Sequence, residues 1–115
     1  MDVKTLRLIL LLAKADLVKP LKVAKAAGVK SVTVYRWIIW RRRPLRMSSI
    51  NTLLGAAGAS RDDLEHPVDV TPKQLAAAAR WFRLDDVTED EIRAAAGDVP
   101  GLAALFDGGR LKARR

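Results

Sequence analysis

The stretch 20–39 limits the possible folds most, because it predicts two short helices with very little chain between them. Pro20 suits the first turn of a helix, and residues 21–27 can continue it. Gly28 predicts the end of that helix, since glycine readily adopts the backbone conformation found there. Ser31 is a suitable N-cap for a second helix that reaches the end of the stretch. The two helices must therefore pack across a tight turn.

The residue spacing within this stretch fits such a turn. Ala24 lies four residues before Gly28 and allows the helices to approach closely, while Val29 can plug the turn from inside. The second helix then has an inward stripe at helical spacing, formed by Val34, Trp37 and Ile38. A short helix, a tight turn and an amphipathic basic helix are typical of a helix-turn-helix.

Helical patterns also dominate the rest of the chain, in which no segment sustains an alternation of apolar and polar residues. Asp2 can cap an apolar first helix that we expect to be buried on more than one side. Thr71 with Pro72, and the capping-box pattern that begins at Thr88, mark two later helix starts. The further helices are expected over 2–15, from Ser48 or Ser49 to Gly58, over 72–82, over 88–96 and over 102–106. We therefore predict an all-α fold.

Several motifs follow one another over residues 2–60. They are an apolar first helix, Val23-Ala24-Lys25-Ala26-Ala27-Gly28-Val29, Val34-Tyr35-Arg36-Trp37, a basic link to Pro44, and a fourth helix that ends in Gly58-Ala59-Ser60. In this order they resemble the phage-repressor (lambda repressor and Cro-like) family of DNA-binding domains. The resemblance implies a repressor-like helix-turn-helix bundle of four helices, to which the chain adds a smaller C-terminal helical extension.

Two positions depart from the family's usual pattern. The family commonly has a glycine where this chain has Trp40, and an acidic or polar residue where it has Ile38. The second helix can therefore run past its usual end. Ile39 and Trp40 then have no obvious place in the core and could pack on the acidic half, line a dimer contact or wedge against DNA. Of these, we expect packing.

The resemblance implies that the outer face of the second helix enters the major groove of double-stranded DNA. The expected base-contacting residues are Ser31, Val32, Thr33, Tyr35, Arg36 and Ile39. Arg36 is the best candidate for a bidentate contact with guanine. The expected phosphate-contacting residues are Lys19, Lys22, Lys25, Lys30, Arg41, Arg42, Arg43 and Arg46. The alternative is that these cations only form a solvated basic face.

Charge divides the chain into three parts. Residues 1–58 carry 12 basic and 2 acidic side chains, a net charge of +10, whereas residues 59–109 carry 5 basic and 11 acidic, a net charge of −6. We expect residues 1–60 to be the DNA-binding domain and residues 61–109 to be an acidic helical extension for dimerisation or for a protein partner. Residues 110–115 are expected to be a basic flexible tail. Alternatively, the unlike charges only keep the two halves soluble and mutually attracted.

The composition argues against an enzyme. The chain has no cysteine and a single histidine, His66, which leaves no His or Cys cluster for a metal or a catalytic triad. The carboxylates of the C-terminal half fit helix caps and helix starts better than metal or acid–base sites. We therefore expect no catalytic residues, no metal and no cofactor.

The hydropathy pattern argues against a membrane protein. The longest apolar run is Leu8–Ala13, six residues, far below the ~20 that cross a bilayer. The N-terminus weakly resembles a secretory signal, but its apolar stretch is shorter than the usual ~7–15 residues. We expect a cytoplasmic protein without a membrane partner.

These features together predict a sequence-specific DNA-binding protein, specifically a transcriptional regulator such as a repressor. One recognition helix covers only a few base pairs, so we expect a homodimer that binds the two halves of an operator. One alternative is an architectural or segregation-type DNA-binding protein with little sequence preference. Another is a DNA-binding accessory of a recombinase or transposase.

Overall fold

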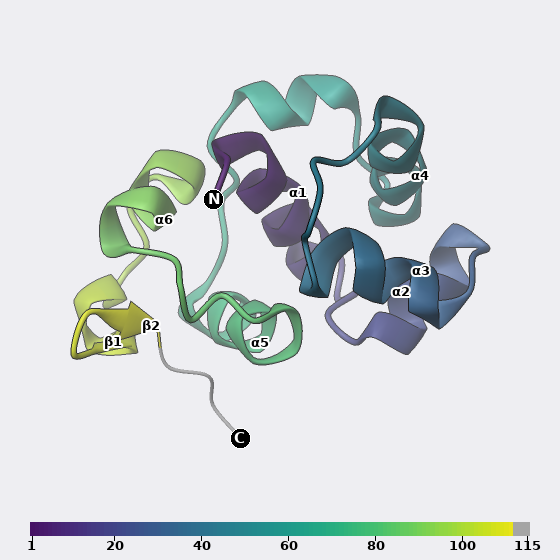
Figure 1. Cartoon of the computed structure of the whole chain (residues 1–115). Helices are drawn as coiled ribbons and strands as arrows, with labels where there is room; N and C mark the ends of the chain where they lie inside the picture. Colours follow the sequence, from purple (N-terminus) through teal and green to yellow (C-terminus); the bar gives the residue numbers. More distant parts are fainter. Residues whose placement is uncertain (112–115) are drawn as a thin grey trace.

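The computed structural model describes residues 1–111, which form a mostly helical structure (Figure 1). The α-helices are α1 (Val3–Lys14), α2 (Pro20–Ala27), α3 (Ser31–Val34), α4 (Met47–Ala57), α5 (Pro72–Phe82) and α6 (Glu89–Ala96). A π-helical segment (Tyr35–Ile39) continues α3, and 3-10 turns cover Arg61–Glu65 and Leu102–Leu105. The prediction of a mostly helical protein is confirmed.

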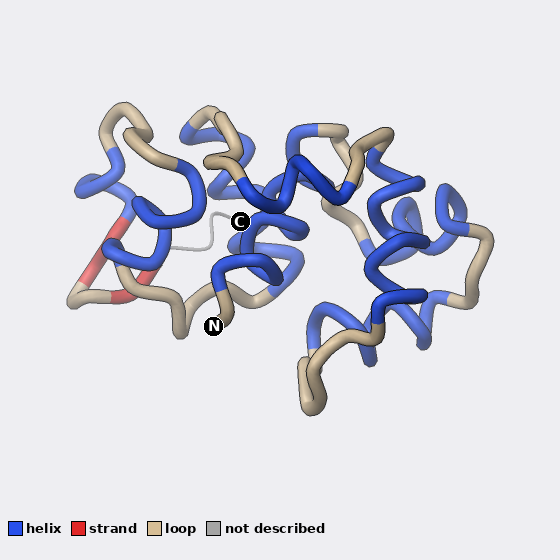
Figure 2. The backbone as a smooth tube through the Cα atoms, turned by 90° about the horizontal axis from the view of Figure 1, so that it is seen from above, coloured by secondary structure: helices blue, strands red, loops and turns tan. Residues whose placement is uncertain are grey.

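A small β-hairpin is the one departure from an all-helical structure within residues 1–111. Strands β1 (Phe106–Asp107) and β2 (Arg110–Leu111) pair antiparallel, with Phe106 opposite Leu111. The hairpin lies at the opposite end of the molecule from α2 and α3 in both views (Figures 1 and 2). Because Leu111 is buried, the prediction that a flexible tail starts at Arg110 is wrong for these two residues. The rest of that predicted tail, residues 112–115, lies outside the described residues.

Side-chain caps fix the starts of three helices where the sequence predicts them. Asp2 accepts a hydrogen bond from the Lys4 amide at 3.1 Å and begins α1. Capping boxes begin α5 and α6. In α5 the side chains of Thr71 and Gln74 each hydrogen-bond the other's main-chain amide, and in α6 the side chains of Thr88 and Glu91 do so. Each cap satisfies amide groups that the first helical turn leaves without a partner.

Glycines end α2 and α4 as predicted. Gly28 and Gly58 have φ values of 70° and 67°, the left-handed conformation that glycine adopts without the strain a side chain would cause. The start of α4 differs from the prediction, because the helix begins at Met47 rather than after Ser48 or Ser49. Its N-cap is Arg46, whose side chain makes no capping hydrogen bond.

Helix α1 lies at the centre of the core. It packs against α4 of the basic half and against α5 and α6 of the acidic half (Figure 1). Leu6, Leu10 and Leu12 are completely buried, which confirms that this helix is covered on more than one side. Because one continuous cluster of apolar side chains includes residues from both sides of position 60, the two halves share a single hydrophobic core.

Arg7 of α1 adds a polar link between the halves. Its guanidinium donates hydrogen bonds to the carbonyl oxygens of Leu64 and Ala94, both at 3.0 Å, and of Ala95 at 3.4 Å. The last carbonyls of a helix lack intrahelical partners and carry partial negative charge. Arg7 therefore caps the C-terminal end of α6 from outside that helix.

Across residues 1–111, no helix combines the length and the apolarity needed to span a bilayer.

Candidate nucleic-acid interface

The turn between α2 and α3 is tight, as the sequence predicts. The amide groups of Gly28 and Val29 both donate to the Ala24 carbonyl, the latter at 3.0 Å, so the chain reverses directly after α2. Val34 and Ile38 of the second helix are buried, as the predicted inward stripe requires. Trp37, the third member of that stripe, is partly buried and packs against the core.

The opposite face of the second helix is accessible. Val32 is 40% exposed and Arg36 is also exposed, whereas Val34 and Ile38 of the same helix are buried. The remaining predicted base-contacting residues that keep some exposed surface are Ser31, Thr33 and Tyr35. This face therefore offers an arginine, hydroxyl groups and an apolar side chain to a partner.

Ile39 does not belong to this face. The Trp40 amide donates to the Tyr35 carbonyl five residues back, at 2.8 Å, so the helix widens into a π turn there. The wider turn places Ile38 and Ile39 side by side in the core, and Ile39 is only 6% exposed. The prediction that Ile39 contacts a base is wrong, and the expectation that it packs is confirmed. Trp40 is 47% exposed, with its ring centroid 5.8 Å from that of Tyr35, so the expectation of packing is wrong for Trp40.

Arg41 does not face outward either. Its guanidinium donates hydrogen bonds to the carbonyls of Ile38 at 2.8 Å, Phe82 at 2.6 Å and Arg83 at 2.7 Å, and it lies 3.5 Å from an Asp86 carboxylate oxygen. Burial lowers the pKa of Arg41, an effect that Asp86 opposes. The prediction of a phosphate contact is therefore wrong, because Arg41 caps the C-terminal end of α5 instead.

The four lysines predicted to contact phosphates are all exposed around α2 and the start of α3. Lys22 lies 3.8 Å from the exposed carboxylate of Asp16, and the Lys19 ammonium lies 5.6 Å from the centre of the Trp81 ring. Lys25 and Lys30 have no ion pair within residues 1–111. Salt bridges between exposed groups are weak, so these four cations remain available to a polyanion.

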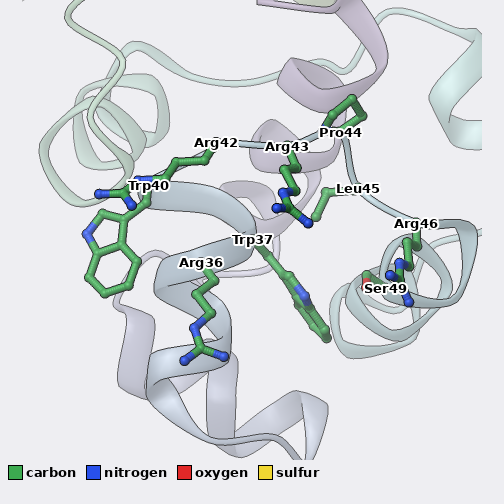
Figure 3. A pocket seen from close by; sticks show the side chains of 9 residues that line it. All are labelled: Arg36, Trp37, Trp40, Arg42, Arg43, Pro44, Leu45, Arg46 and Ser49. Carbon is green, nitrogen blue, oxygen red and sulfur yellow. The ribbon is translucent and has the colours of Figure 1, made fainter.

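The three remaining arginines of the predicted phosphate set surround a cavity together with Arg36 (Figure 3). The cavity has a volume of about 530 Å³ and is lined by Arg36, Trp37, Trp40, Arg42, Arg43, Pro44, Leu45, Arg46 and Ser49. The π segment, the link and the first turn of α4 each supply part of its wall. Ser49 was not among the predicted site residues. The sequence feature that could have indicated it is its position in the first turn of α4, directly after the basic link.

Acidic residues form no comparable cluster in the described part. Within residues 1–111, no group of three His, Asp or Glu side chains is arranged to hold a metal ion. The carboxylates of Asp63 and Glu91 instead complete capping boxes at helix starts.

Comparisons with known proteins do not assign this arrangement to a family. No protein-family model matches the chain, and neither the curated proteins nor the solved structures include a significant match. Its function must therefore be inferred from its own geometry and charge.

Proposed function

We propose that this protein binds double-stranded DNA sequence-specifically, with the helix from Ser31 to Ile39 in the major groove, and that it regulates transcription as a homodimer on an operator. The observation that carries the proposal is the exposed outer face of this helix, where Val32 and Arg36 point away from the buried Val34 and Ile38. Such a helix, held rigidly by its inner face, can enter a major groove without rearranging the core.

Arg36 supports the proposal through its freedom from other partners. Its guanidinium makes no ion pair or side-chain hydrogen bond within residues 1–111, so its planar set of donors can bind O6 and N7 of a guanine. Val32, one turn earlier, can contact the methyl group of a thymine. These two side chains provide a polar and an apolar determinant for reading a sequence.

The cations around this helix support the proposal through their position. Lys25 and Lys30 flank the tight turn, and Arg43 and Arg46 lie beyond the other end of the helix. Together they can contact phosphates on both sides of a groove. The acidic first turn of α6 lies on the opposite side of the molecule from α3 in both views, so it does not oppose such binding (Figures 1 and 2).

The proposal of a homodimer follows from the small number of base pairs that one helix can contact. One recognition helix contacts only a few base pairs, and two copies spaced by about 34 Å would read two half-sites on one side of the duplex. Sedimentation with and without DNA measures this directly. A species that stays monomeric at every concentration, also on DNA, would remove the dimer from the proposal.

Selection from a randomised duplex pool at moderate salt tests the proposed function. An enriched inverted repeat is expected and would define the operator. Retention without an enriched motif would favour the architectural alternative, in which phosphate contacts provide nearly all the affinity. Absence of retention would refute DNA binding.

A further inference from the structure

The arginine-lined cavity beside the second helix has an unusual charge pattern. Four of its lining residues are arginines and none is acidic. Side-chain hydrogen bonds and ion pairs within residues 1–111 involve the guanidinium groups of Arg7, Arg41 and Arg93, but none of the four cavity guanidinium groups. The four guanidinium groups therefore repel one another around a concave surface, and an anion placed there would relieve this repulsion.

The start of α4 supplies further donors to the same cavity. Its N-cap, Arg46, offers no side-chain acceptor, so amide groups of the first turn remain without a capping partner. The partial positive charge of a helix N-terminus also favours an anion at this point.

Ser49 is a second sign of a ligand at the start of α4. It is the one polar residue that is buried within the described part of the chain, at 9% exposure, and it lines the cavity. Its hydroxyl has no hydrogen bond to another described residue, yet no completely buried side-chain donor or acceptor there is left unsatisfied. The hydroxyl therefore keeps some accessible surface, and because Ser49 lines the cavity, an acceptor bound there can use this donor.

Aromatic rings form another part of the cavity wall. Trp37 and Trp40 both line it, on the side of the π segment, and Arg36 lies between them in the close view (Figure 3). Trp40 has nearly half its surface exposed although its neighbour Ile39 is buried. A flat ring bound against an exposed indole gains stacking energy that phosphate alone cannot provide.

We propose that this cavity binds a nucleoside phosphate, with its phosphates held by Arg43, Arg46 and the Ser49 hydroxyl and its base against the indole of Trp40. The volume of about 530 Å³ lies within the range of small-ligand sites. The ligand is either a free nucleotide or a nucleotide within a single strand. This binding does not rest on the proposed recognition of duplex DNA and is measured without it.

Occupancy of the cavity would have a consequence for the proposed function. Arg36 belongs both to the cavity and to the exposed face of the second helix. A nucleotide that engages Arg36 would compete with duplex DNA for the same guanidinium. If duplex binding is absent, nucleotide binding can still be present, so the two proposals can fail separately.

Isothermal titration calorimetry of the full chain with ATP, in the absence of divalent cations, tests the ligand class. Inorganic tripolyphosphate supplies the phosphates alone and adenosine the ring alone. We expect ATP to bind about tenfold more tightly than tripolyphosphate, because stacking adds to the ionic contacts, and adenosine to bind far more weakly than ATP. Equal affinity for ATP and tripolyphosphate would overturn the proposal, because it indicates adsorption of any polyanion.

The affinity for a short single-stranded oligothymidine, compared with that for ATP, distinguishes a free nucleotide from a nucleotide within a single strand. Tight ATP binding with weak oligothymidine binding identifies a free nucleotide, and the reverse identifies a strand; either result supports the nucleoside phosphate. Binding of neither probe overturns it.

Substitutions locate the site. Arg46→Gln should weaken ATP and tripolyphosphate alike, whereas Trp40→Ala should weaken ATP about tenfold and leave tripolyphosphate unchanged. Lys14→Gln is the charge-matched control, because Lys14 is exposed at the end of α1 and does not line the cavity. Circular dichroism confirms that each variant is folded. If Lys14→Gln weakens ATP as much as Arg46→Gln does, binding reflects overall charge and the site is refuted.

Discussion

The arginines of the basic half differ in what their side chains face. Arg7 and Arg41 turn inward and donate to carbonyl oxygens at the ends of α6 and α5. The side chains of Arg36, Arg42, Arg43 and Arg46 turn outward and make no hydrogen bond or ion pair within the described residues. Positive charge in a nucleic-acid-binding pattern therefore does not by itself identify a nucleic-acid contact. Helix C-termini compete for the same guanidinium groups.

Removal of an inward arginine should destabilise the protein more than any other substitution proposed here. Arg41→Ala leaves several carbonyl oxygens without a donor in a region where the Arg41 side chain is only 18% exposed. We expect a loss of about 2–4 kcal/mol in the free energy of unfolding, measured by chemical denaturation. The outward neighbour is the control, and Arg42→Ala should change this value by less than about 0.5 kcal/mol. An equal loss of unfolding free energy for the two variants would show that inward and outward arginines do not differ in their effect on stability.

The next effect concerns the outward group and is measured on DNA. Arg36→Ala should cost about 1–3 kcal/mol in binding to the preferred duplex and should relax the preference at one base pair. Its stability should stay close to that of the unmodified protein, because Arg36 is exposed. Binding measured on duplexes changed at each position identifies the base pair. A loss that is the same on every duplex would show that Arg36 contacts phosphate instead.

A smaller effect is expected for the lysines beside the tight turn. Lys25→Ala should weaken binding to all duplexes alike and reduce the slope of log affinity against log salt by about 1, since one phosphate contact is lost. Titration at several salt concentrations measures the slope. Lys14→Ala is the matched control on another helix. If Lys25→Ala and Arg36→Ala behave identically, the proposed placement of the helix in the groove is wrong.

The parts of the fold that the sequence predicted correctly depend on local chemistry. Asp2, Thr71 and Thr88 cap the predicted helices because a capping side chain and the amide it bonds lie within three residues of each other. Gly28 ends α2 for a similarly local reason. The inward positions of Val34 and Ile38 follow from helical periodicity alone.

The errors arise where distant segments decide the outcome. Arg41 turns inward because the end of α5, 41 residues further along the chain, presents carbonyl oxygens to it. Ile39 is buried because a π turn rotates it toward the core, and helical periodicity assumes a regular α-helix. Leu111 is buried by pairing with a strand of two residues, which is too short to leave a pattern in the sequence. The sequence therefore predicted which segment of the chain carries the candidate site, but not exactly which of its residues face outward.

The smallest effect concerns an exposed ion pair that joins the halves beside Arg7. Lys4 of α1 lies 2.9 Å from a carboxylate oxygen of Glu65, and both side chains are more than half exposed. Hydrogen bonding and attraction from Lys4 lower the pKa of Glu65 below its ordinary value of 4.5. This pair therefore stabilises the fold fully above about pH 4.5, and its contribution disappears as the pH falls through the lowered pKa.

Glu65→Gln isolates this contribution, because it removes the charge and keeps the size of the side chain. The melting temperature of the variant should lie slightly below that of the unmodified protein at neutral pH, and the difference should vanish in acid. Salt at about 0.5 M should also reduce the difference, since it screens exposed charges. Asp69→Asn is the control, because Asp69 is exposed and has no ion pair within residues 1–111. A difference that persists in acid and in salt would show that Glu65 acts through packing rather than through its charge.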